Sequence, residues 1–278
     1  MKSDTLPDIG HVTTEVIDGL RIRLARSGRS YGTPVLFTSP WPESIYAFHR
    51  VLPHFVETHR VIAVDLPGFG HSESRPDVMS PRAMAGFLVK LAAHLKLDRL
   101  YAVGPDVGAL AFLFAAAEHP QLFECLAIGG AATQVDLAAG QLKDIIASPK
   151  GAFAAIDGAQ AVSGYLTQAA RITPPAIIDD FRLASADRRF EDAAQFVRAY
   201  NADLPELGPR LSQIQTPVLV IAGKNDPIVP AANNKFLADR LPRNRLCLLD
   251  AAHRVWDEAA EDYSRQIMAW IGGEYRAA

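Results

Sequence analysis

The stretch LYAVGPDVGAL, residues 100–110, is an apolar run that is interrupted by a single carboxylate, Asp106. Gly104 and Gly108 flank it in the pattern G-x-D-x-G, and the Ala-rich run GALAFLFAAAEHP (108–120) follows as far as Pro120. The first run is typical of a buried strand and the second of a buried helix. Glycines at these positions permit a sharp turn from strand to helix. The stretch therefore predicts such a turn, with a charge at its apex that is costly unless a partner or a reaction uses it.

Short β-rich runs recur along the chain, and several are apolar on both faces, as buried parallel strands are. They are RIRLA (21–25), PVLFT (34–38), RVIAVDLP (60–67), LYAVG (100–104), CLAIGG (125–130), PVLVIAG (217–223) and NRLCLLD (244–250). Helical patterns alternate with them, such as PRAMAGFLVKLAAHLKL (81–97), in which Pro81 suits the first helical position. This alternation predicts an α/β fold with right-handed crossover connections.

The alternation stops between residues 132 and 210. The segments AAGQLKDIIASP, AQAVSGYLTQAARI, PPAIIDDFRLA and RRFEDAAQFVRAYNADL in this region all have helical periodicity and none resembles a strand. About 80 residues is far too long for an ordinary connection between strands. We therefore expect an all-helical lid at residues 132–210, inserted into a core formed by residues 1–131 and 211–278.

The composition excludes several classes of protein. The chain has 278 residues, of which 49% are hydrophobic and 21% charged, with a formal net charge of −3. This balance gives no sign of a nucleic-acid partner or an anionic membrane surface. No run reaches the ~20 apolar residues of a membrane span, and the opening MKSDTLPDIGHV is unlike a signal peptide. Cys125 and Cys247, both in predicted buried strands, suggest neither a disulfide framework nor a metal site. We expect a cytoplasmic protein without cofactor or metal, and the oligomeric state stays open, a homodimer included.

Two more polar stretches stand where a nucleophile at Asp106 would need partners. GKND (223–226) offers Asp226 after the next-to-last strand, and DAAHRVW (250–256) offers His253 after the last strand. Asp136, which follows the CLAIGG strand, is the alternative acid. The order nucleophile, acid, histidine at the carboxyl ends of strands is that of the α/β-hydrolases.

From about residue 20 onward, the chain resembles the α/β-hydrolase fold superfamily. DLPGFGHS (65–72) resembles the loop after the second long parallel strand, and SPWP (39–42) stands where many members carry H-G-x-P. The resemblance implies a mostly parallel eight-stranded sheet with helices on both faces and an inserted helical lid. An aspartate at position 106 resembles the epoxide hydrolases and the haloalkane or haloacid dehalogenases, because esterases and lipases usually carry serine there.

An aspartate near its ordinary pKa of about 3.9 is ionised at neutral pH and can attack without a base. Attack on an sp³ carbon that carries a leaving group gives an ester, whereas attack on an acyl carbon would give a high-energy anhydride. His253 would then activate a water that attacks the Asp106 ester, with Asp226 orienting the imidazole ring. The backbone N–H groups of Trp41 and Val107 are the expected oxyanion donors.

The leaving group depends on the lid. An epoxide opens to an alkoxide and needs a proton donor, which in the resembling hydrolases is usually a pair of lid tyrosines. The lid offers Tyr165 and Tyr200, and Tyr200 follows Phe196 by one helical turn, near the place where a family tyrosine would fall. We expect these three residues and Trp41 to contact the substrate. The Trp41 indole N–H would also suit a halide, although Val107 replaces the halide-binding tryptophan that often follows a dehalogenase nucleophile.

The sequence therefore predicts a cofactor-independent hydrolase acting through an aspartyl ester, with epoxide opening to a diol as the preferred reaction. Its partners would be a small apolar to amphipathic electrophile and water. A dehalogenase on the same triad is the first alternative, and a non-catalytic ligand-binding protein is the second. Three lid arginines, Arg182, Arg188 and Arg189, are expected on a solvated helix face.

Overall fold

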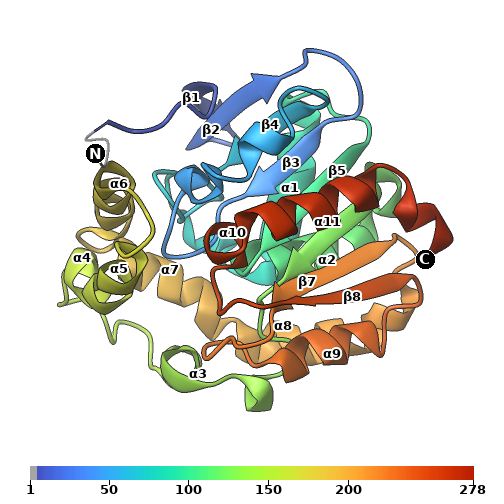
Figure 1. The fold of residues 1–278 in the computed structure, drawn as a ribbon. Helices are drawn as coiled ribbons and strands as arrows, with labels where there is room; N and C mark the ends of the chain where they lie inside the picture. Colours follow the sequence, from blue (N-terminus) through green and yellow to red (C-terminus); the bar gives the residue numbers. More distant parts are fainter. Residues whose placement is uncertain (1–4) are drawn as a thin grey trace.

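The computed structural model describes residues 5–278, which form one eight-stranded sheet in the order β1-β2-β4-β3-β5-β6-β7-β8 (Figure 1). The pairs β1–β2 and β2–β4 are antiparallel, and all other neighbouring strands are parallel. Strands β3 and β4 exchange places relative to their order in the chain, so that β3 and β5 lie at the centre. The predicted mostly parallel eight-stranded sheet is confirmed.

Each of the seven β-rich runs contains a strand, and one further strand precedes them. The strands are β1 His11–Ile17, β2 Leu20–Gly28, β3 Val35–Thr38, β4 Arg60–Val64, β5 Leu100–Pro105, β6 Phe123–Gly129, β7 Val218–Gly223 and β8 Asn244–Leu249. The sequence pattern did not predict β1, because this edge strand pairs with β2 and is largely solvent-facing, so that its sequence HVTTEVI carries no apolar run.

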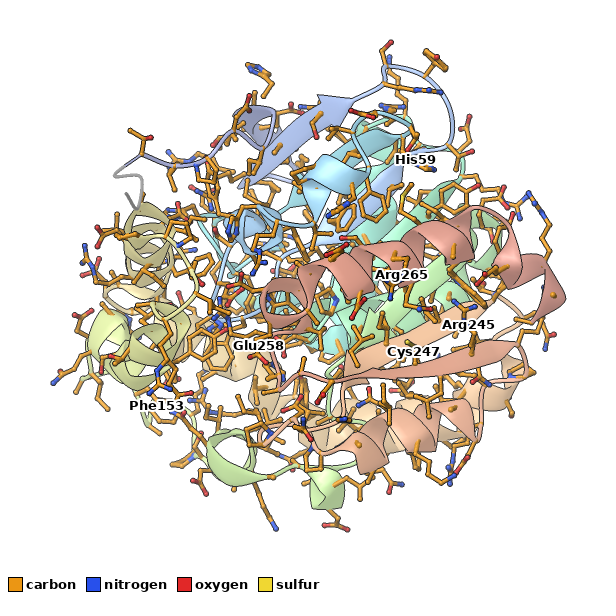
Figure 2. The ribbon with its side chains drawn as sticks, viewed as in Figure 1. His59, Phe153, Arg245, Cys247, Glu258 and Arg265 are labelled. Carbon is orange, nitrogen blue, oxygen red and sulfur yellow. The ribbon has the colours of Figure 1, made fainter. Side chains whose placement is uncertain are left out.

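The other edge strand, β8, is less buried than its apolar sequence suggests. Leu246 is 38% exposed and Leu248 is 40% exposed. Cys247 is only half-buried and lies toward α11, where Figure 2 also labels Arg265. The expectation of a buried strand holds for Cys125, but for Cys247 it is wrong, because β8 has a strand neighbour on one side only.

Helices cover both faces of the sheet, with α11 in front of it in Figure 1 and α1 and α2 behind. They are α1 Pro81–His94, α2 Val107–Glu118, α9 Ala231–Ala238, α10 Val255–Glu258 and α11 Ala260–Ile271. Ser80 caps α1 by accepting a hydrogen bond from the Ala83 N–H, with Pro81 in the first helical position. No helix within residues 5–278 is both long and apolar enough to cross a membrane.

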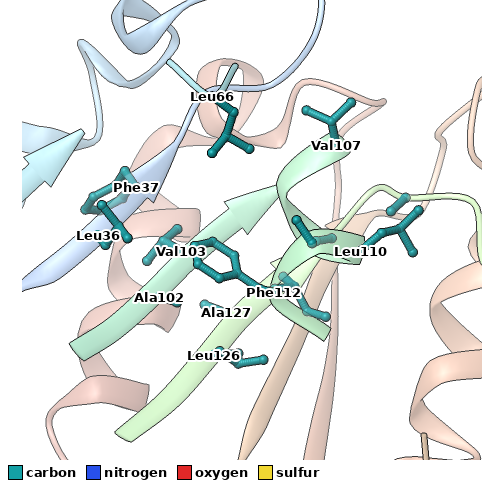
Figure 3. Close-up of a cluster of buried hydrophobic side chains, with 14 of the residues drawn as sticks. Leu36, Phe37, Leu66, Ala102, Val103, Val107, Leu110, Phe112, Leu126 and Ala127 are labelled. Carbon is teal, nitrogen blue, oxygen red and sulfur yellow. The ribbon is translucent and has the colours of Figure 1, made fainter. Parts of the chain in front are cut away.

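The core beneath the G-x-D-x-G turn is close-packed. Figure 3 shows Phe112 of α2 beside Val103 of β5, with Phe37 of β3 and Leu126 of β6 in the same cluster. Every residue of α2 from Val107 to Ala116 is buried. Burial of this apolar surface is the main stabilising contribution, and it fixes the start of α2 against the end of β5.

The chain between β6 and β7 forms helices and no strand in the described structure. We call residues 132–210 the lid. Its helices are α3 Gly140–Ala147, α4 Gly158–Ala161, α5 Ser163–Ala169, α6 Pro175–Ser185, α7 Arg189–Arg198 and α8 Tyr200–Leu207. The long periodic run RRFEDAAQFVRAYNADL is divided between α7 and α8. Figure 1 shows α4, α5 and α6 beside one end of the sheet.

A buried ion pair joins the lid to the core. Asp180 of α6 accepts hydrogen bonds from Arg23 Nη1 at 2.9 Å and from Ser44 Oγ at 2.5 Å, and its carboxylate lies 3.0 Å from His71 Nε2. Arg23 Nε also donates to Asp65 at 2.6 Å. Burial alone would raise the pKa of Asp180, but the hydrogen bonds from His71 and Arg23 outweigh it and hold the pKa well below its ordinary value.

Arg189 is the exception among the three lid arginines expected on a solvated face. Arg182 and Arg188 are exposed, but Arg189 is only partly so. Its guanidinium donates to the backbone carbonyls of Gly70 at 2.6 Å and Ser72 at 2.8 Å. For Arg189 the expectation was wrong, because the loop after β4 lies against the start of α7 and accepts its hydrogen bonds. No local sequence pattern indicates that this loop and the lid are in contact.

We predict that Asp180→Ala lowers the free energy of unfolding by about 3 to 5 kcal/mol, because it leaves the Arg23 charge buried without one of its partners. Urea denaturation measures the change. The matched control is Asp179→Ala, since the Asp179 side chain is 67% exposed and pairs with exposed Arg182; its expected loss is below about 0.5 kcal/mol. Equal losses in the two variants would contradict the buried link.

Candidate active site

Asp106 occupies the apex of the turn between β5 and α2 with an unusual backbone. Its φ is 55° and its ψ is −123°, a combination that a non-glycine residue adopts only when its surroundings hold it there. The Asp106 N–H donates to the Gly129 carbonyl of β6 at 2.9 Å. This anchors the turn to the neighbouring strand and projects the side chain beyond the end of the sheet.

The two glycines of the motif are required by close packing. A Cβ at Gly108 would lie 2.0 Å from Thr38 Oγ1, and one at Gly104 would lie 2.5 Å from the Phe112 ring. Distances under 3 Å are not tolerated without movement of one partner. The pattern G-x-D-x-G therefore follows from the close approach of β3, β5 and α2.

The Asp106 carboxylate is met by backbone donors. The Trp41 N–H donates to Asp106 Oδ2 at 2.7 Å, and the Val107 N–H also hydrogen-bonds the carboxylate. Both predicted oxyanion donors therefore contact the side chain of Asp106. The Trp41–Pro42 peptide bond is cis. Burial raises the pKa of Asp106 to about 6, against the opposing influence of the His253 charge and the two N–H groups.

His253 is paired with the predicted acid. His253 Nδ1 lies 2.7 Å from Asp226 Oδ2, and the other carboxylate oxygen of Asp226 accepts from the N–H groups of Ile228 and Val229 at 2.8 and 2.9 Å. Burial opposes charge on the imidazole, but the hydrogen bond and charge of Asp226 outweigh it and raise the pKa of His253. The alternative acid, Asp136, is exposed and lies in a short turn after β6.

Gly130 shows how close the nucleophile lies to the histidine. Its position immediately follows β6, and a Cβ there would lie 3.6 Å from His253 Cε1 and 4.0 Å from the Asp106 nitrogen. The electrostatic attraction between Asp106 and His253 agrees with this proximity. With Asp226 on the other side of the imidazole, the three predicted residues lie together at one end of the sheet.

A cavity of about 170 Å³ lies over these groups. Its walls come from the loop after β3, the nucleophile turn, the lid and the loops after β7 and β8. The lining residues are Trp41, Pro42, Asp106, Gln141, Leu142, Ile145, Ala161, Val162, Gly164, Tyr165, Phe190, Ile228 and His253. Most are apolar, and Gln141 and Gly164 are the exposed residues among them. Within residues 5–278, no cluster of three or more His, Cys, Asp or Glu side chains could hold a metal ion.

Comparison with known proteins agrees with this architecture. Residues 33–151 match the family model of the α/β-hydrolase fold. The solved structure of the epoxide hydrolase CorEH superposes with a TM-score of 0.81 at 20% identity, covering 94% of this chain and 98% of that chain. Residues 33–151 and the arrangement of the whole sheet therefore show the α/β-hydrolase fold.

Two curated relatives of this hydrolase-fold chain differ in their reactions. A soluble epoxide hydrolase from a Corynebacterium species is 36% identical over 101 residues, which are 36% of this chain and 35% of that protein. The pimeloyl-[acyl-carrier protein] methyl ester esterase of Neisseria meningitidis serogroup B is 26% identical over 247 residues, 85% of this chain and 92% of that protein. The similarity therefore shows the α/β-hydrolase fold and leaves the reaction to be argued from the site.

Of the three lid residues predicted to contact the substrate, one lines the cavity and two do not. Tyr165 lines the cavity, but its hydroxyl donates to Glu43 Oε1 at 2.5 Å. Tyr200 and Phe196 are buried and do not line it; Phe196 packs edge-on against Phe69 and against Tyr200. Burial, with smaller contributions from the Asp106 and Asp203 charges, raises the pKa of Tyr200 well above its ordinary value.

A buried polar network behind the triad was missed by the sequence analysis. Arg254 donates through Nε to Glu43 at 2.6 Å and through Nη2 to Thr173 and Asp257 at 2.8 and 2.6 Å. Trp256 Nε1 donates to the second oxygen of Glu43 at 2.8 Å. The one sequence feature that could have indicated these residues was their position next to predicted site residues: Glu43 directly follows the SPWP stretch, and Arg254 directly follows His253. Neither charge reveals its distant partner in the sequence.

The titration of Asp106 can be measured directly. We predict a midpoint near pH 6 for its carboxyl ¹³C resonance, because burial disfavours the ionised form. His253→Gln should move this midpoint to higher pH, since it removes the positive charge that favours the carboxylate. The exposed Asp179 carboxyl serves as the internal control, with no response to His253→Gln. A midpoint near the ordinary value of 3.8 for Asp106 would contradict the burial of this group.

We also predict that Gly108→Ala destabilises the fold by about 1 to 3 kcal/mol through the clash with Thr38 Oγ1. Adding Thr38→Ala should recover part of the loss, because it removes the clashing oxygen. Gly86→Ala on the exposed face of α1 is the control and should stabilise by up to about 1 kcal/mol, since nothing lies within 4 Å of its new Cβ. Thermal unfolding of the four proteins measures these effects, and a neutral Gly108→Ala would refute the packing argument.

Proposed function

We propose that this chain is a hydrolase that opens small apolar epoxides through an ester on Asp106. One observation carries the proposal: the nucleophile turn presents a carboxylate, held by the Trp41 and Val107 N–H groups, inside a mostly apolar cavity with His253. A carboxylate attacks saturated carbon readily and gives a stable ester there. Relatives described as epoxide hydrolases support the same reading.

In the first step, an Asp106 oxygen forms a bond to an epoxide carbon while the carbon–oxygen bond of the ring breaks. The departing oxygen takes a proton from a lid tyrosine. Tyr165 is the donor that borders the cavity, and burial and the Glu43 charge raise its pKa well above the ordinary value. The Tyr165 hydroxyl therefore stays protonated at neutral pH. To donate to the substrate, its O–H must rotate away from Glu43, to which it now donates.

In the second step, His253 removes a proton from water, whose oxygen attacks the carbonyl carbon of the Asp106 ester. The backbone N–H groups of Trp41 and Val107 stabilise the oxyanion, and such a donor typically contributes about 3 kcal/mol. The tetrahedral intermediate then expels the alkoxide, which takes the proton from the imidazolium. Asp226 stabilises that imidazolium. The proton left on the Asp106 carboxyl returns to the Tyr165 phenolate, so that the products are a diol, a restored carboxylate and a restored tyrosine.

A halide is the second candidate leaving group, and one feature of the cavity favours it. The Tyr165 proton is already held by Glu43, whereas the indole N–H of Trp41 has no hydrogen-bond acceptor among residues 5–278. A halide leaves with its electron pair and needs only N–H donors. The same Asp106 ester would form, and its hydrolysis would yield an alcohol.

Trapping the ester tests the proposal. We predict that His253→Gln forms the Asp106 ester but hydrolyses it about a thousandfold more slowly than the wild type. Intact-mass measurement after mixing with styrene oxide should show a gain equal to the whole epoxide. With 1-bromobutane, the gain would instead be the butyl group, with bromide released. The mass therefore identifies the leaving group.

Asp106→Asn in the His253→Gln background is the control and should give no adduct. In heavy-oxygen water, one turnover of the wild type should place label in the Asp106 carboxylate, because the water oxygen stays on the enzyme. An adduct on another residue, or turnover without label in Asp106, would overturn the proposed mechanism.

A further inference from the structure

A second cavity lies on the other side of Tyr165 from the first. Its volume is about 270 Å³, and its polar walls include Gln168, Arg171, Arg254 and Glu258. Gln168, Arg171 and Glu258 are exposed, so that the cavity opens to solvent, while Arg254 is buried at its inner end. Figure 2 labels Glu258, the last residue of α10, on the side of that helix that is nearer the lid.

Tyr165 is the wall that the two cavities share, since it lines both. Its hydroxyl is fixed to Glu43 at 2.5 Å, and the Arg254 guanidinium lies 5.7 Å from the centre of its ring. His253 lines the first cavity and Arg254, the next residue along the chain, lines the second. Tyr165, together with its neighbours Glu43 and Arg254, therefore stands between the cavity that contains His253 and a polar space.

The proposed reaction needs water at a moment when the first cavity cannot supply it. Once the substrate is joined to Asp106, its carbon chain takes up space in a cavity of only about 170 Å³, which leaves little room for a water beside it. The walls around it are mostly apolar and offer water few partners, whereas an ordered water needs about two to four. The polar groups of the second cavity meet that need.

We propose that the second cavity holds the water that hydrolyses the Asp106 ester and delivers it past Tyr165 to His253. This inference rests on the proposed aspartyl-ester mechanism. The water passes one proton to the imidazole, which then protonates the departing alkoxide. The water oxygen stays in the Asp106 carboxylate, and the second proton of the water returns to the Tyr165 phenolate left by the first step. The first step, which uses no water, does not depend on the second cavity.

Filling the second cavity separates the two steps. Gln168→Trp places a bulky apolar side chain at its wall without touching the first cavity. In single-turnover mixing with styrene oxide, quenched samples give the ester-bearing fraction by intact mass. We expect ester formation at the wild-type rate and ester decay slowed by about tenfold. Ile172→Trp fills the same cavity from another position, so it should also leave ester formation unchanged and slow ester decay. Agreement between the two variants excludes a local folding defect of Gln168→Trp as the cause.

Thr167→Trp is the matched control, because exposed Thr167 precedes Gln168 on α5 and lines neither cavity. It should leave both rates unchanged. Ester decay at the wild-type rate in folded Gln168→Trp and Ile172→Trp, shown by unchanged thermal unfolding, overturns the water route and leaves the ester mechanism intact. Absence of any ester in the wild type and in His253→Gln overturns the mechanism and this inference together.

Discussion

The whole site depends on keeping an ionisable carboxylate buried at the end of β5. Burial raises the pKa of Asp106 to about 6, because it disfavours the ionised carboxylate, so neighbouring groups must stabilise that charge. The Trp41 and Val107 N–H groups and the His253 charge provide it. The positive φ of Asp106 and the two flanking glycines are the backbone conditions for holding the side chain there.

Four consecutive residues connect this carboxylate with the lid. Trp41 donates to Asp106, Glu43 accepts from Tyr165 of α5, and Ser44 donates to Asp180 of α6. The same short segment therefore contacts the nucleophile and two lid helices. Removal of either lid contact would leave a buried charge with fewer partners, so the segment and the lid stabilise each other.

The site divides into an apolar cavity that meets the nucleophile and a polar network behind the histidine. Low polarity around Asp106 strengthens every hydrogen bond and charge interaction in the cavity. Glu43 has Arg254 and Trp256 as partners, and its charge contributes to the raised pKa values of Tyr165 and His253. Both groups are thereby kept protonated over a wider pH range than in water.

The sequence by itself determined the sheet strands, the turn at Asp106 and the positions of Asp226 and His253, because each is a local pattern placed at the end of an apolar strand. The solvent-facing strand β1 was not predicted, because its sequence carries no apolar run. Only the tertiary structure decided that Tyr165 faces the cavity while Phe196 packs in the core, and that Glu43 meets Arg254. Those outcomes depend on contacts between segments more than a hundred residues apart, which local periodicity and spacing do not encode.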